Sequence, residues 1–116
     1  MLTTESAQRN LCEQYGAEFS PAVAASKVGM ALNVRAGVKP LNGLRHLPEM
    51  GTSGWFIWAG TVLSQEEDFF VPLHMQHLVD WCPPVLKYLA LPPGWRFLVD
   101  ESHEDIWYDE TLLTPG

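Results

Sequence analysis

Five consecutive apolar residues, Trp55-Phe-Ile-Trp-Ala59, constrain the fold of this chain more than any other feature. The run is flanked by Gly54 and Gly60 and has the length of a β-strand, in which successive side chains point to opposite faces. Because both faces of this strand are apolar, we expect it to lie in a sheet that is covered on both sides, or to leave one exposed hydrophobic surface that can bind a partner. A chain of 116 residues has room for one core, so residues 1–116 are expected to form a single domain.

Hydrophobic periodicity predicts the other regular elements. In chain order they are a helix at 3–16, a strand at 28–35, a helix at 72–82, a short helix at 84–89, and a terminal β-hairpin with strands at 95–100 and 105–108. Strands joined by hairpins, with helices collected beside them, are typical of an α+β domain. We therefore expect a small, mostly antiparallel sheet of four or more strands, with two to three helices packed on one face.

No period holds over residues 36–53, which are interrupted by prolines and glycines and carry Arg45 and His46. A connection of this length in a compact domain is usually functional, or it contains an element that the pattern does not reveal. Residues 64–68 are polar and acidic and indicate a loop, and the tail after Leu113 is expected to fray.

Acidic residues are concentrated in the second half of the chain. Residues 1–65 hold four acidic and five basic residues, a balance of +1, whereas residues 66–116 hold ten and two, a balance of −8. This charge argues against nucleic-acid binding and would attract a basic partner, although an acid excess also keeps small proteins soluble. No apolar run approaches the ~20 residues that span a bilayer, and Met1–Ser6 does not resemble a signal peptide, so we expect a cytoplasmic protein.

Neither catalysis nor a metal site is favoured by the sequence. Cys12 and Cys82 lie far apart and are expected to be two buried free thiols. His74 and His77 would share a helix face and could bind a metal together with His103, but spacing alone is weak evidence for a site. None of the familiar nucleotide-binding, hydrolase or zinc-protease motifs occurs. We therefore expect no catalytic residue, no cofactor and no enzymatic activity.

The tryptophans are more informative. Four of the five, Trp55, Trp58, Trp95 and Trp107, lie on proposed strands, and alternation places Trp55 and Trp58 on opposite faces. A 13.0 kDa protein can hardly bury all of them, so we expect Trp58 or Trp107 to be exposed. Exposed tryptophan beside arginine and acidic residues is typical of interface hot spots.

Several segments, in order, resemble one family of small bacterial proteins. They are Gly54-Trp-Phe-Ile-Trp-Ala-Gly60, Phe69-Phe-Val-Pro-Leu-His74, Leu89-Ala-Leu-Pro-Pro-Gly-Trp-Arg-Phe97 and Glu104-Asp-Ile-Trp-Tyr-Asp109, with Pro40-Leu-Asn-Gly-Leu-Arg-His46 fitting an upstream element. The family is that of the immunity-protein 33 domains of polymorphic toxin systems, formerly a domain of unknown function. The resemblance implies a non-catalytic cytoplasmic protein that binds and neutralises a cognate toxin. The acidic second half would suit a basic toxin.

Three hypotheses follow for function. A toxin-binding protein would use a contact set made of Arg45, His46, Trp58, Asp105, Trp107 and Asp109. A small-molecule or metal-binding housekeeping domain would instead use His74, His77, Trp81 and His103. A homodimer joined through an exposed sheet is the third hypothesis, with the tryptophans as the self-interface.

Overall fold

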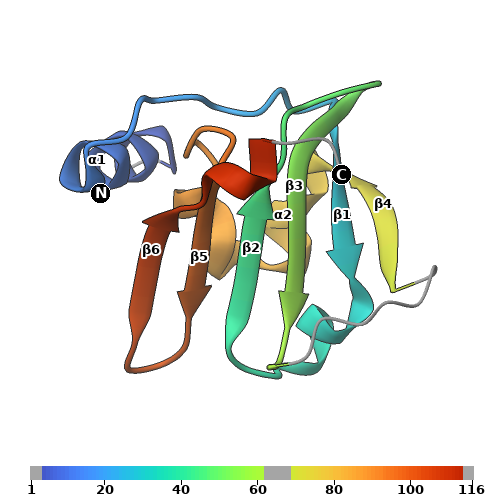
Figure 1. Ribbon diagram of the computed structural model, residues 1–116. Coiled ribbons are helices and arrows are strands. Elements are labelled where there is room, and N and C mark those ends of the chain that lie inside the picture. Colours follow the sequence, from blue (N-terminus) through green and yellow to red (C-terminus); the bar gives the residue numbers. More distant parts are fainter. Residues whose placement is uncertain (1–3, 62–68, 114–116) are drawn as a thin grey trace.

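The computed structural model describes residues 4–61 and 69–113, and the account below is confined to them. The elements are α1 (Thr4–Tyr15), β1 (Lys27–Ala31), the 3-10 helix η1 (Leu32–Ala36), β2 (Leu41–Arg45), β3 (Thr52–Ala59), β4 (Phe70–His74), η2 (Met75–His77), α2 (Leu78–Trp81), η3 (Pro83–Tyr88), β5 (Trp95–Val99), β6 (Glu104–Tyr108) and η4 (Glu110–Leu113) (Figure 1). No helix in these ranges is long and apolar enough to cross a membrane.

The strands form one six-stranded sheet in the order β4-β1-β3-β2-β5-β6. Only β1 and β3 pair in parallel among these neighbours, and the other pairs are antiparallel. This confirms the predicted α+β class with its mostly antiparallel sheet and terminal hairpin. The strand around Trp55 lies inside the sheet as expected, between β1 and β2.

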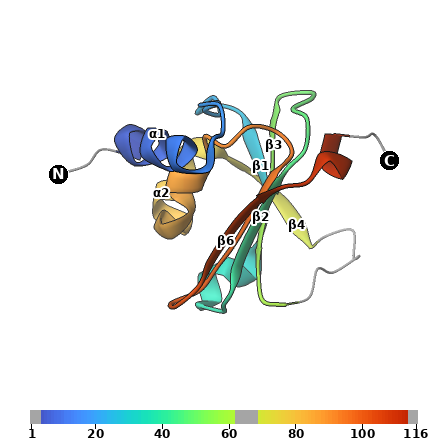
Figure 2. The same ribbon diagram turned by 60° about the vertical axis from the view of Figure 1, so that its left-hand side comes forward.

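The main core lies between the sheet and a layer made of α1, α2 and η3, which lie on the same side (Figure 2). The strands contribute side chains to this core that are at most 1% exposed, namely Val28, Met30, Trp55, Ile57 and Phe97. The short η4 is on the other side, where Leu112 joins a second cluster with Ala31, Leu44 and Trp58. Helical elements therefore lie on both sides of the sheet, with η4 opposite α1 and α2.

The predicted N-terminal helix and terminal hairpin are confirmed. Leu11 and Cys12 are the buried residues of α1. The helix ends at Tyr15 and is followed by Gly16, whose φ of 68° is the left-handed conformation that glycine adopts readily. Cys12 and Cys82 are both buried free thiols, and burial raises the pKa of each.

The strand predicted at 28–35 is correct only as far as Ala31, because the chain then turns into η1. Asn33 is responsible for part of this turn, since its side-chain amide bonds both the N–H and the C=O of Ala59. Leu32, which alternation would place on the apolar face, is 58% exposed. The Asn33 amide thus takes the place of a neighbouring strand in bonding the backbone of Ala59. Hydrophobic periodicity alone does not predict such a contact.

A strand, β2, is hidden in the stretch of 36–53 that showed no period. All five residues of β2 are buried. Gly43 is required there because a Cβ atom would overlap the ring of Phe97. The buried Asn42 amide donates to the carbonyl of Gly60 over 2.8 Å. The glycine and the polar residues that suggested a loop are therefore features of a central strand.

The helix predicted at 72–82 is wrong in its first half. Residues up to His74 form β4, and only the single turn Leu78–Trp81 is α-helical. Pro72 is tolerated because β4 is an edge strand, with a partner only on the β1 side in the described part of the chain. The short helix predicted at 84–89 corresponds to η3, a 3-10 helix. The loop at 64–68 and the tail at 114–116 lie outside the described residues.

Candidate functional site

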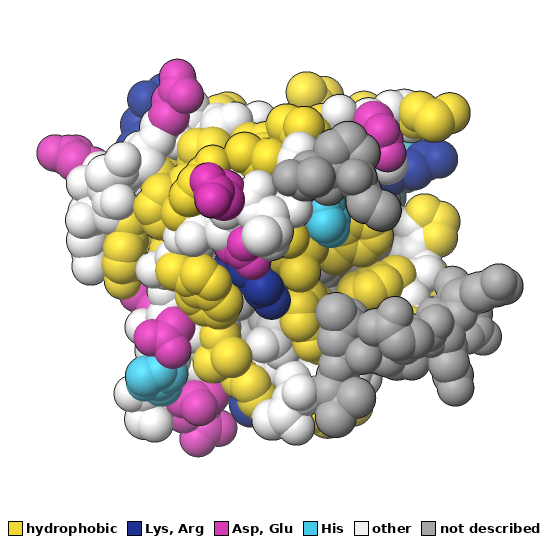
Figure 3. All heavy atoms as spheres, in the orientation of Figure 1, with side chains coloured by type: hydrophobic (Ala, Val, Ile, Leu, Met, Phe, Trp, Pro, Cys, Tyr) yellow, Lys and Arg dark blue, Asp and Glu magenta, His cyan; other side chains and the backbone are white. Residues whose placement is uncertain are grey.

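The face of the sheet turned away from α1 and α2 is called the open face here. Opposed residues of neighbouring strands share a face, so the strand registers define rows of side chains across it. One row is Trp58, Asn42, Leu98 and Asp105, and the next is Phe56, Leu44, Arg96 and Trp107, each read from β3 to β6. Hydrophobic side chains gather across this face, and acidic ones are most numerous towards the β5–β6 hairpin and α1 (Figure 3).

The half of the open face over β3 and β4 carries an aromatic cluster made of Leu44, Phe56, Trp58, Phe69, Phe70 and Leu112. Phe70 is its centre, with ring centroids 5.2 Å from Phe56 and 4.9 Å from Phe69 in edge-to-face geometry. A hollow of about 200 Å³ is lined by four members of the cluster, Leu44, Phe56, Trp58 and Phe70, and by His46. Since Trp58 is only 5% exposed, this half is a second small core more than a contact surface.

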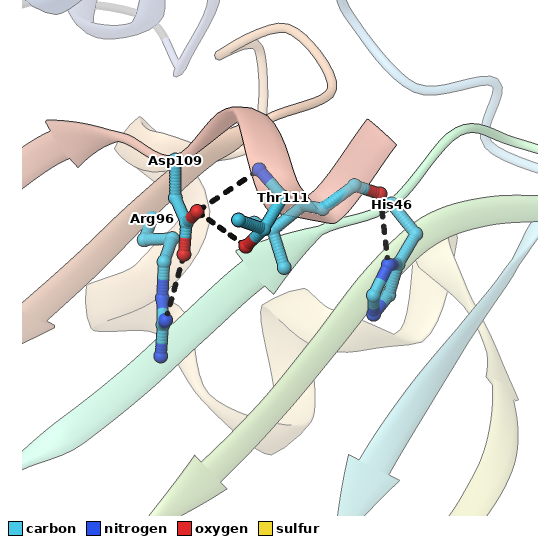
Figure 4. Close-up of polar contacts among 5 residues, drawn as sticks. His46, Arg96, Asp109 and Thr111 are labelled. Carbon is cyan, nitrogen blue, oxygen red and sulfur yellow. Dashed lines mark hydrogen bonds and ion pairs between the residues drawn. The ribbon is translucent and has the colours of Figure 1, made fainter. Parts of the chain in front are cut away.

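The half over β5 and β6 is built around Arg96. Its guanidinium lies 5.2 Å from the ring of Trp107 and donates to Oδ2 of Asp109 over 3.2 Å (Figure 4). Oδ1 of Asp109 accepts bonds from the hydroxyl and the backbone N–H of Thr111. These bonds, that of the Thr111 hydroxyl first, lower the pKa of Asp109 and keep it ionised. The result is a fixed platform of Trp107, Arg96 and a carboxylate.

His46 lies at the border of the aromatic cluster and contacts two of its members. Its Nδ1 lies 3.1 Å from the carbonyl oxygen of Leu112, which ties the end of β2 to η4 (Figure 4). The same ring packs edge-on against Phe56 at a centroid distance of 5.5 Å. His46 is thus an exposed residue with a fixed orientation at the border of the aromatic cluster.

A different polar network lies on the helical side of the hairpin, where Glu104 bridges three elements. It accepts hydrogen bonds from the hydroxyls of Tyr88 and Tyr15, and it lies 3.3 Å from the Lys87 ammonium. The network borders a cleft of about 560 Å³ between α1, η3 and the hairpin. Burial and then the Glu104 contact raise the pKa of Tyr88, so its hydroxyl stays protonated and donates. The network fixes the hairpin against η3 and α1.

Acidification is expected to weaken the fold through Glu104. The hydrogen bond from Tyr88, followed by that from Lys87, lowers the pKa of this carboxylate. A lowered pKa contributes stability that is present above the unfolded value of about 4.3 and is lost as pH falls through the folded value. We expect Glu104→Gln to reduce the free energy of unfolding at pH 7 by about 1–2 kcal/mol. The penalty should shrink towards pH 3, as measured by urea denaturation.

The exposed Glu101, which has no ion-pair partner in the described ranges, supplies the control for this measurement. Glu101→Gln should leave the unfolding free energy nearly unchanged at every pH. A Glu104→Gln penalty that stayed constant down to pH 3 would contradict the role given to the Glu104 charge.

The six predicted contact residues divide between two sides of the sheet. Asp105 and Trp107 lie on the open face, His46 and Asp109 lie beside it, and Arg45 points into the main core. Arg45 is 4% exposed and donates to the carbonyls of Ser20, Ser53 and Leu91. Arg45 and Trp58 therefore have packing roles in this structure. The expected exposed tryptophan is Trp107, which is 38% exposed.

The three histidines proposed as weak metal candidates do not form one group, because only His74 and His77 are neighbours. His74 ends β4 and His77 ends η2, with ring centroids 6.1 Å apart. His103 lies at the opposite edge of the sheet, before β6, and its Nε2 pairs with Asp105 over 2.7 Å. Within residues 4–61 and 69–113 no group of three or more potential ligands is close enough to hold a metal ion.

Arg96 and Leu98 are half-buried residues of the open face that the sequence pattern alone did not indicate. The signal that could have found them is the hairpin itself. A four-residue turn, 100–103, between β5 and β6 places Arg96 opposite Trp107 and Leu98 opposite Asp105. Both pairs then share the face opposite the buried Phe97.

Comparison with known proteins identifies a family for this chain. A family model described as "Imm33-like domain" matches residues 7–109, which is most of the chain. No curated protein and no solved structure matches it.

Proposed function

The chain belongs to the Imm33-like domain family, and from this premise we propose that it is an immunity protein that binds and neutralises a cognate bacterial toxin in the cytoplasm. The family match over residues 7–109 is the observation that carries the proposal. In this proposal the protein acts by stoichiometric binding and performs no chemistry of its own.

The half of the open face over β5 and β6 supports this role as a contact surface. It combines the exposed Trp107 with an ordered arginine and with carboxylates, which is the composition of binding hot spots. From residue 97 to the end there is no lysine or arginine, so the surface around this platform is acidic. We therefore propose a basic toxin as the partner, steered towards the hairpin by charge.

The proposal is tested with the toxin encoded beside this gene. Cells expressing that toxin should survive when this protein is co-expressed, and the purified pair should associate below micromolar concentration. Toxin released from the complex by denaturation and refolding should have unchanged mass and full activity. Absence of association at micromolar concentration would overturn the proposal, and a permanently modified toxin would replace binding with catalysis.

Trp107 is expected to be an energetic centre of the complex. Trp107→Ala should weaken toxin affinity roughly 30-fold, because exposed tryptophans at interface centres commonly contribute about 2 kcal/mol. The unfolding free energy should change by about 1 kcal/mol or less, since the side chain is 38% exposed. Titration calorimetry measures the affinity. Val79→Ala, on a residue 55% exposed on α2, is the control and should bind normally; equal affinities for both variants would place the contact elsewhere.

A further inference from the structure

The sheet ends at β6, and this edge is open in the part of the chain that the structure describes. β6 pairs with β5 along one side and has no strand neighbour on the other. In Figure 2, where this side of the molecule comes forward, no described element crosses in front of β6. An open edge exposes backbone N–H and C=O groups that can pair with another chain.

The pairing with β5 shows which backbone groups are free. Asp100 donates its N–H to the carbonyl of His103, and Asp109 donates to Gly94, so these residues face each other in hydrogen-bonded pairs. In an antiparallel ladder such pairs alternate with pairs whose backbone groups point away. The N–H and C=O groups of Glu104, Ile106 and Tyr108 therefore point towards the open edge.

The two edges of the sheet differ in their protection. The other edge strand, β4, contains Pro72, which has no N–H to offer. β6 contains no proline or lysine, and its five residues pair with β5 in regular register without a bulge. Two large side chains flank its free edge, with Trp107 38% and Tyr108 50% exposed. This edge thus lacks the proline, the lysine and the bulge by which proteins often block strand addition, and its charged residues, Glu104 and Asp105, are acidic.

Charge indicates what kind of strand would fit. Residues 97–113, from β5 through η4, carry six acidic residues, Asp100, Glu101, Glu104, Asp105, Asp109 and Glu110, and no lysine or arginine. The one arginine of the hairpin, Arg96, is already paired with Asp109. A second copy of the chain paired at this edge would bring two such acidic hairpins together, and like charges across neighbouring strands are destabilising. A strand with lysine and arginine side chains would instead be attracted.

We propose that the free edge of β6 accepts an additional strand from a basic protein partner. Main-chain bonds to Glu104, Ile106 and Tyr108 would supply affinity, and Trp107, Tyr108 and the hairpin acids would select the side chains of the added strand. The inference deepens the proposed function and rests on it for the identity of the partner, which is the toxin.

Two variants of one residue separate backbone pairing from side-chain contact. Ile106→Pro removes the backbone N–H that points to the free edge. Ile106→Ala also removes most of the isoleucine side chain but keeps this N–H. With the toxin as probe, we expect Ile106→Pro to bind at least tenfold more weakly than Ile106→Ala. Both variants are first checked for a native circular dichroism spectrum. Equal affinity of the two folded variants would overturn strand addition while leaving the proposed function intact.

Residue-resolved amide exchange on the wild-type protein provides a test that needs no variant. Alone, the amides of Asp105 and Trp107 should exchange slowly and that of Ile106 fast. Bound toxin should slow Ile106 exchange at least tenfold. Toxin that binds without slowing it would overturn the inference. The inference would also be overturned if the Ile106 amide of the protein alone became protected as the protein concentration rises. A second copy of the chain would then occupy the free edge.

A peptide probe keeps the two proposals distinguishable if the toxin does not bind. An eight-residue alternating Lys-Val peptide should slow exchange at Ile106, and its Glu-Val counterpart should not. Protection by the basic peptide alone would support the edge inference and reject the toxin. The edge inference would be overturned if neither the toxin nor the basic peptide slowed exchange at Ile106. It would also be overturned if the two peptides slowed this exchange equally.

Discussion

Arg45→Met is expected to lower the free energy of unfolding by about 3 kcal/mol. The Arg45 guanidinium is buried and holds three separate segments together. Its Nε donates to the carbonyl of Ser53 over 2.9 Å, and one terminal nitrogen donates to those of Ser20 and Leu91 over 2.7 and 2.8 Å. Methionine fills similar space but leaves these carbonyls without a donor, at about 1–3 kcal/mol for each that stays buried.

The cost of burying the positive charge of Arg45 offsets only part of the stability that its hydrogen bonds provide. Burial lowers its pKa to about 10, so the group is still protonated at neutral pH. No carboxylate pairs with it among the described residues. Removing the cation relieves part of its desolvation cost, which is why we expect about 3 kcal/mol rather than the sum of three lost bonds.

Urea denaturation followed by circular dichroism measures the effect of Arg45→Met. The matched control is Arg35→Met, because Arg35 is exposed and its guanidinium stacks on Trp81, so its loss should cost less than about 1 kcal/mol. A small stability loss for Arg45→Met together with tenfold weaker toxin binding would restore Arg45 to the contact set.

The elements predicted correctly are those whose patterns are complete within a short window. α1 has its apolar stripe and a glycine end, and the terminal hairpin has two alternating runs around a polar turn. The elements that were missed depend on distant residues. β2 contains Gly43 because Phe97, from another strand, occupies the space of its side chain. No local pattern carries that information.

Prediction of the site was limited by the same cause. Alternation correctly placed Trp55 and Trp58 on opposite faces of one strand. It could not show that Trp58 lies over the centre of the sheet under Phe70, while Trp107 lies on an edge strand. Strand order decides which apolar residues are covered, and strand order follows from long-range pairing. An arginine in a loop-like stretch such as Arg45 is expected at the surface, although two of its three carbonyl partners, Ser20 and Leu91, are distant in the sequence.

Strand order also connects the stability of the fold to the proposed interface. β2 lies between β3 and β5, so the β5–β6 hairpin reaches the rest of the sheet only through β2. The contacts that hold β2 in place, those of Arg45 inside and His46 outside, thereby position Trp107 and the free edge of β6. Loss of binding in a variant at either end of β2 must therefore be compared with its loss of stability before it is assigned to a contact.

Gly54→Ala is expected to lower the free energy of unfolding by about 3 kcal/mol or more, through two separate effects. Gly54 has a φ of 88°, a conformation that costs other residues about 1–2 kcal/mol. A Cβ atom there would also overlap the carbonyl oxygen of His46. The backbone cannot easily move away, because the His46 N–H donates to the carbonyl of Gly54 over 2.9 Å. The overlap must then be relieved by weakening the β2–β3 pairing.

Gly51→Ala separates the two effects, because Gly51 has a similar φ of 83° and a Cβ there would meet nothing within 4 Å. We expect this variant to lose only the conformational part, about 1–2 kcal/mol. Urea denaturation of both variants gives the steric part as the difference. Gly54→Ala should also release the His46 ring from Leu112, which a change in the nuclear magnetic resonance chemical shifts of the His46 ring would detect. Equal stability losses in the two variants would contradict the close approach of the backbone at Gly54, because conformation alone would then explain both.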